Sequence, residues 1–78
     1  MNQILIHIKV FTMKEEQDIW VSPCFVVEEL MQRLKALWLH GRYRYENGLY
    51  LMEEKRFLDL KKTLEENQVI QGDHLILY

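Results

Sequence analysis

The sequence of 78 residues predicts an α+β fold in which a mixed sheet packs on one amphipathic helix. Three observations support this fold class. Apolar residues recur with a period of two near both ends of the chain, and with a helical period between them. The third observation is size, because a chain with 49% hydrophobic residues and one proline can bury one core but not two. We therefore interpret residues 1–78 as a single domain.

A β-hairpin is predicted at the start of the chain. Residues 3–11 form the first expected strand, in which Ile4, Ile6, Ile8 and Val10 share one face. The polar residues 12–16 separate it from a second strand over residues 17–21, where Ile19 and Val21 share a face. Pro23 has no backbone N–H to donate, so it should end the pairing.

An amphipathic helix is predicted from Val26 onward. Its apolar residues occupy positions i, i+3, i+7, i+10 and i+11, which are Val27, Leu30, Leu34, Leu37 and Trp38. Glu28 and Glu29 favour the first turn through the helix dipole, and Gly41 stands where a C-terminal cap permits positive φ. The residues before the helix offer no good side-chain acceptor, which predicts a poor N-terminal cap.

The second half of the chain predicts short strands and turns. Asn47-Gly48 favours a tight turn after the alternating Tyr43 and Tyr45. Strands are expected at 49–53, at 57–60 and at 73–78, with one helical turn at 62–67 anchored by Leu64. Four leucines of these segments should face the core: Leu49, Leu51, Leu75 and Leu77. The order ββαββ, turn, β with a right-handed crossover is typical of a β-grasp.

Composition argues against several classes of function. The net charge of −2 and the absence of a basic arm disfavour nucleic acid as the main partner. A short chain buries little surface, so a deep substrate cavity would compete with the core, which disfavours an enzyme. The lone Cys24 cannot form an intramolecular disulfide, and we expect it to be a small apolar filler in a cytoplasmic protein. No signal peptide or membrane span is recognisable.

The motifs that could carry chemistry have plainer interpretations. His7, His40 and His74 lack the spacing of metal ligands, and we expect surface histidines and no cofactor. His7 and His74 both face outward on neighbouring predicted strands, which leaves adventitious metal binding open. Arg42-Tyr43-Arg44-Tyr45 combines guanidinium groups with aromatic rings, a pattern that suits single-stranded nucleic acid. A β-grasp domain that binds nucleic acid through Arg42 to Tyr45 is therefore the alternative function.

Apolar side chains are also expected on the sheet face opposite the helix. If the four leucines point inward, period two turns their neighbours toward solvent. These outward residues, together with one from the first strand, are Leu5, Tyr50, Met52, Ile76 and Tyr78. An exposed apolar area of this kind usually marks an interaction surface, although long neighbouring side chains such as Lys9 could cover part of it.

The chain resembles ubiquitin over its whole length. Its second strand and helix are similar in spacing at Val21, Pro23, Val27, Leu30 and Leu34, and its closing segment at Lys62-Thr63-Leu64, Val69, Leu75 and Leu77. The resemblance is closer to the YukD and EsaB family, small ubiquitin-like proteins of type VII secretion systems in Gram-positive bacteria. The comparable features there are Met1-Asn2-Gln3, Val26-Val27-Glu28-Glu29-Leu30 and Gly72-Asp73-His74-Leu75-Ile76-Leu77.

This resemblance implies a non-enzymatic adaptor of the secretion machine. Its partner would be a membrane component, either the ATPase or a bitopic core subunit, and a homodimer stays open as an alternative. Ubiquitin's recognition patch is similar in location to Met52, Ile76 and Tyr78. The sequence ends at Tyr78 and not at the Gly-Gly tail that conjugated modifiers and sulfur carriers share, so we expect neither conjugation nor sulfur transfer.

Overall fold

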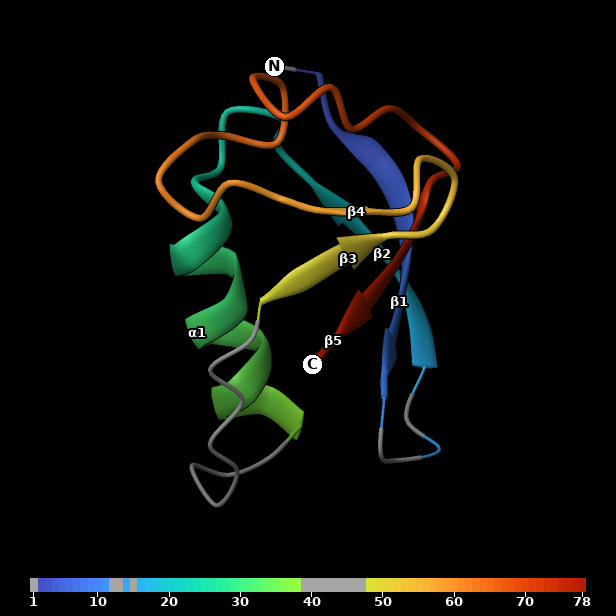
Figure 1. Cartoon of the computed structure of the whole chain (residues 1–78). Coiled ribbons are helices and arrows are strands. Elements are labelled where there is room, and N and C mark those ends of the chain that lie inside the picture. Colours follow the sequence, from blue (N-terminus) through green and yellow to red (C-terminus); the bar gives the residue numbers. More distant parts are fainter. Residues whose placement is uncertain (1, 12–13, 15, 39–47) are drawn as a thin grey trace.

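The fold is seen in a computed structural model, which describes residues 2–11, 14, 16–38 and 48–78. Within these residues, five strands form one sheet in the order β2-β1-β5-β3-β4, and α1 lies against one face of it (Figure 1). The elements are β1 (Ile4–Val10), β2 (Glu16–Val21), α1 (Val27–Trp38), β3 (Leu49–Leu51), β4 (Arg56–Phe57) and β5 (His74–Leu77). This is the predicted α+β class with the predicted element order.

The sheet is mixed because β1 and β5 run parallel while the other pairs run antiparallel. The period-two pattern of β1 is confirmed: Ile6, Ile8 and Val10 are fully buried. The four leucines of β3 and β5 that were expected to face the helix are also fully buried. The core therefore lies between α1 and one face of the sheet, and the other face is left for solvent.

The buried stripe of α1 differs from the predicted one at its end. Val27, Leu30 and Leu34 are buried as expected, and Met31 joins them. Leu37 was expected in the core, but its side chain is 69% exposed. The expectation was wrong because Leu37 lines an open groove between α1 and β2 and not the closed core. The polar Gln17 lines the same groove.

The start of α1 is closed by a distant loop instead of a side-chain cap. The backbone N–H of Val27 donates to the carbonyl oxygen of Lys62, and that of Glu28 to the carbonyl oxygen of Leu60, both at 3.0 Å. The first N–H groups of a helix have no partner within the helix. The carbonyls of this loop supply the acceptors that the residues before the helix lack.

The loop that follows β4 corrects one prediction and agrees with another. The strand expected at 57–60 ends at Phe57 in the structure, since the N–H of Asp59 turns to the side chain of Asn67. Residues 62–67 were expected to form one helical turn anchored by Leu64. The N–H of Asn67 donates to the carbonyl oxygen of Thr63 at 3.0 Å, which closes one such turn, and Leu64 is fully buried as expected. Thr63 and Glu66 bond each other reciprocally, each backbone N–H donating to the other's side chain.

Several smaller expectations also change. The strand predicted at 49–53 ends at Leu51, because turns occupy residues 52–55. Cys24 was expected to fill space before the helix, but it is exposed in the turn after β2. The predicted cap at Gly41 and the segment Arg42 to Tyr45 lie outside the described residues. In the part of the chain that the structure describes, no helix has the length and apolarity to cross a membrane.

Candidate protein-interaction surface

The sheet face turned away from α1, called the outer face below, carries the five residues predicted for partner binding. Alternation along the strands directs Leu5 of β1 to this face. Tyr50 of β3 and Ile76 of β5 are directly opposite each other in the antiparallel register. Met52 and Tyr78 follow two positions later in the same alternation. Their placement is as expected, and their role in binding stays a prediction.

Four aromatic rings adjoin on the outer face and form what we call the aromatic cluster: Phe11, Tyr50, Phe57 and Tyr78. The rings of Phe11 and Tyr78 are stacked with their centroids 4.5 Å apart. Phe57 contacts Tyr78 and Tyr50 edge-on, at 5.6 Å and 5.1 Å. Phe11 is 56% exposed and Phe57 is 51% exposed, so the cluster presents apolar surface to solvent.

Sequence reasoning missed two members of this cluster. Phe11 continues the alternation of Leu5 along β1, and that signal could have identified it. Phe57 had no such signal. It reaches the cluster because β4 pairs with β3 so that Phe57 faces Tyr50, and this register depends on the turn at 52–55.

The outer face is not the single apolar patch that the sequence predicts. Leu5 lies at the far end of β1, opposite Trp20 of β2. His7 and Lys9 follow it in the alternation and separate it from the aromatic cluster. Met52 is exposed beside His74, whose carbonyl oxygen accepts its N–H at 3.0 Å. The cluster and Ile76 therefore form the apolar area, with polar groups between it and Leu5.

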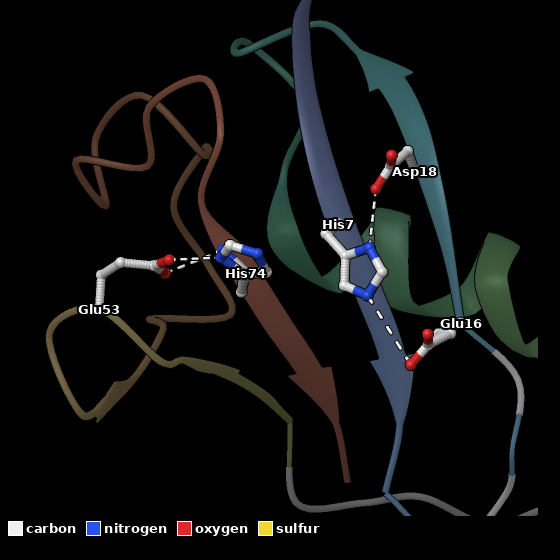
Figure 2. Close-up of polar contacts among 5 residues, drawn as sticks. All are labelled: His7, Glu16, Asp18, Glu53 and His74. Atoms are coloured by element: carbon white, nitrogen blue, oxygen red, sulfur yellow. Dashed lines mark hydrogen bonds and ion pairs between the residues drawn. The ribbon is translucent and has the colours of Figure 1, made fainter.

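One of these residues, His7, belongs to a pair of histidines with carboxylate partners (Figure 2). His7 and His74 are neighbours in the parallel register, and their ring centroids are 5.4 Å apart. His7 Nδ1 lies 2.7 Å from an oxygen of Asp18, and its Nε2 lies 3.9 Å from one of Glu16. His74 Nδ1 lies 2.5 Å from Glu53 Oε2, while Glu53 Oε1 accepts the His74 backbone N–H at 2.8 Å.

The histidine pair holds local structure, because each ring bonds to carboxylates of a different neighbouring segment. Figure 2 shows His74 directed to Glu53 and His7 directed to Asp18 and Glu16, on opposite sides of the pair. Among the described residues, no group of three or more His, Cys, Asp or Glu side chains is placed to hold a metal ion. The carboxylates thus bind each ring to its own neighbouring strand or turn.

A pH-dependent contribution to stability is expected from Glu53. Desolvation by partial burial raises its pKa, but the hydrogen bonds from the backbone and ring of His74 together outweigh this and keep the pKa below the ordinary value. A lowered pKa in the folded state stabilises the protein above the unfolded pKa of about 4.3, and this gain is lost as pH falls through the folded value. Because the side chain is 40% exposed, we expect less than about 1 kcal/mol.

The measurement compares urea denaturation of the wild type with Glu53→Gln between pH 6 and pH 3. The stability difference should be present at pH 6 and shrink toward pH 3. Glu65→Gln, an exposed carboxylate outside this pair, is the control and should show no such trend. A difference for Glu53→Gln that stays constant with pH would contradict the assignment.

Solved structures resemble this chain over nearly its whole length. Ubiquitin from Caldiarchaeum subterraneum matches with a TM-score of 0.73 at 21% identity, over 97% of this chain and 91% of that chain. The chain has a ubiquitin-like fold. An EccD5 ubiquitin-like domain from Mycobacterium xenopi matches with a TM-score of 0.62 at 12% identity, over 100% of this chain and 94% of that one.

The ubiquitin-like fold does not by itself fix a function. A chain of phenol hydroxylase from Pseudomonas sp. OX1 matches with a TM-score of 0.76 at 14% identity, over 96% of this chain and 71% of that chain. A comparison with family models and with curated proteins finds no match. Function therefore has to be argued from the surface of this chain.

Proposed function

We propose that this chain is a non-enzymatic ubiquitin-like adaptor that binds a partner protein through the aromatic cluster and Ile76. The observation that carries the proposal is the exposure of Phe11 and Phe57 within a contiguous set of four rings. Aromatic side chains offer large apolar area at low cost in conformational entropy, and they are enriched among the residues that dominate binding energy. Isolated exposed apolar residues are ordinary, whereas a contiguous group on a sheet face favours an interface.

The setting we propose is the cytoplasmic side of a type VII secretion system. The support is the resemblance to the YukD and EsaB family together with the structural likeness to EccD5, a type VII secretion component. The partner would be the soluble part of a membrane component, either the ATPase or a bitopic core subunit. Binding to such a domain requires an exposed apolar anchor and no insertion into lipid.

We also propose that the chain acts without being conjugated to other proteins. The backbone N–H of Tyr78 donates to the carbonyl oxygen of Gly48 at 3.0 Å, and the ring of Tyr78 packs within the aromatic cluster. A residue held by both its backbone and its ring is poorly placed to extend into the narrow channel of an activating enzyme. Intact-mass analysis of the protein from its native cells should show one unmodified species, and a covalent adduct with another protein would contradict this.

Replacing Phe57 with Ser should weaken partner binding more than tenfold. A central aromatic anchor commonly contributes at least about 2 kcal/mol to an interface, which corresponds to more than tenfold in affinity. Folding should be nearly intact because half of the side chain already faces solvent. Calorimetric titration with the purified cytoplasmic domains of the ATPase and of the bitopic subunit gives the affinity.

Ile70→Ser is the matched control, because Ile70 is 65% exposed and lies outside the sheet. It should bind like the wild type. Thermal melts of both variants check that neither loses binding through unfolding. Normal binding by Phe57→Ser would contradict the proposed surface. Sedimentation of the free protein tests the homodimer alternative, which predicts that Phe57→Ser dissociates a dimer.

A further inference from the structure

A second apolar area lies on the opposite side of β2 from the outer face, in a groove between β2 and α1. The groove has a volume of about 280 Å³. Its apolar lining includes Ile19, Val21, Phe25, Leu34 and Leu37. The exposure of Leu37 is explained by this position, since its side chain covers one wall of an open groove and not the closed core.

The groove runs beside the β2 edge of the sheet, where no other described strand pairs with the outer side of β2. The N–H groups of His7 in β1 and of Phe11 just after it donate toward β5 and the residue before it, and the carbonyl of Leu5 accepts from Gly72. Successive residues of a strand direct their backbone groups to opposite sides, so the alternate residues of β1 must bond to β2. Ile4 and Ile6 therefore exchange hydrogen bonds with their register partners, Val21 and Ile19.

Because Ile19 and Val21 bond to β1, the backbone groups of the alternate residues Asp18 and Trp20 point away from the sheet. β2 is an edge strand, and within the described residues no other strand pairs with its outer side. Trp20 is also 59% exposed. An edge with unpaired N–H and C=O groups is a template for an additional strand, and natural proteins often cover or interrupt it.

We infer that the β2 edge and this groove form a second binding site, which accepts an extended peptide as an additional strand. Backbone hydrogen bonds to Asp18 and Trp20 would hold the peptide, and its alternate side chains would enter the groove beside Ile19. This site is separate from the aromatic cluster, which belongs to other strands and to the opposite face of the sheet.

Charge defines the peptide more closely. Among the residues that the structure describes, Arg33 is the one charged side chain in the groove lining, and its guanidinium lies 5.0 Å from the centre of the Phe25 ring. An acidic residue that follows the apolar residues of the peptide would lie close to the Arg33 guanidinium. On the other face of the edge, Asp18 and Glu16 favour neutral or basic residues. Two copies of β2 would bring four such carboxylates to one junction, which disfavours a second copy as the occupant.

The test uses a designed peptide of nine residues, Asp-Lys-Ile-Thr-Val-Lys-Ile-Thr-Asp. Its apolar side chains alternate with Lys and Thr, and it carries Asp at both ends, so that either strand direction offers an acid to Arg33. Amide exchange measured by NMR should slow at least about tenfold for Asp18 and Trp20 when the peptide saturates the protein. The amides of Ile19 and Val21 already bond to β1 and should change little.

Variants of the protein and of the peptide test the apolar, ionic and backbone contributions to peptide binding separately. Leu37→Ala should weaken the peptide about fivefold through lost apolar contact. Arg33→Ala should weaken it about twofold to fivefold, as expected of an exposed ion pair. Placing Pro at both the central Val and the Thr before it should abolish binding, because in either strand direction one of these two residues donates its N–H to β2, and Pro has no N–H to donate. Phe57→Ser should bind the peptide normally, which keeps this test independent of the proposed adaptor surface.

Several results would overturn the inference. One is the absence of binding at millimolar peptide, and another is a shift pattern confined to the aromatic cluster. Equal binding of the Pro peptide would show that the contacts are not those of an added strand. Protection of Asp18 and Trp20 in the free protein, rising with protein concentration together with dimer in sedimentation, would assign the edge to a second copy.

Discussion

Replacing Leu30 with Ala is expected to lower the free energy of unfolding by about 2–5 kcal/mol. Leu30 lies on the buried stripe of α1 and is 4% exposed, in a core with the fully buried leucines of β3 and β5. Truncation removes its apolar contacts and leaves a cavity that a well-packed interior closes only in part. Urea denaturation followed by circular dichroism measures the loss.

Leu37→Ala is the matched control on the same helix. Helical periodicity alone assigns Leu37 to the core, whereas the structure leaves it 69% exposed. The substitution should therefore change the free energy of unfolding by less than about 0.5 kcal/mol, as is usual for surface positions. Equal losses for Leu30→Ala and Leu37→Ala would mean that the last turn of α1 packs as the sequence pattern predicts and that the groove beside β2 is closed.

The features that sequence predicted well are those with a local pattern. The alternation in β1 requires one face to be buried, so Ile6 and Ile8 could be assigned to the core without knowing their neighbours. The same holds for Leu75 and Leu77 in β5. The order of the elements then restricts the topology to few arrangements, which is why the ubiquitin-like fold could be predicted.

Features that depend on contacts between distant residues could not be predicted in this way. The acceptors for the start of α1 come from Leu60 and Lys62, more than thirty residues later in the chain. The position of Phe57 in the aromatic cluster depends on the register between β3 and β4. The carboxylate of Glu53 reaches His74 only because β3 and β5 are neighbours. Composition and spacing carry no record of such partners.

Asn67 is the clearest case of a residue whose role depends on distant partners. Its replacement by Ala should lower the free energy of unfolding by about 2–4 kcal/mol. This range combines three lost hydrogen bonds at about 1 kcal/mol each with the penalty for the groups left unpaired. The side chain is buried. Its Oδ1 accepts the N–H of Asp59 at 2.7 Å, and its Nδ2 donates to the carbonyl oxygens of Asp59 and Thr63 at 3.0 and 2.9 Å. One amide thus joins both ends of the loop after β4, and its own carbonyl accepts from Arg56.

The effect of Asn67→Ala should be concentrated at the start of α1, because the loop that Asn67 holds supplies the acceptors for Val27 and Glu28. Native-state hydrogen exchange should show these two amides opening more readily than the amide of Leu34 in the middle of the helix. Gln71→Ala, at an exposed polar position, is the control and should leave both regions unchanged. If Val27 and Glu28 exchange in step with Leu34 in the Asn67→Ala protein, the loop does not act as the cap of α1, and the loss of stability has its origin elsewhere in the core.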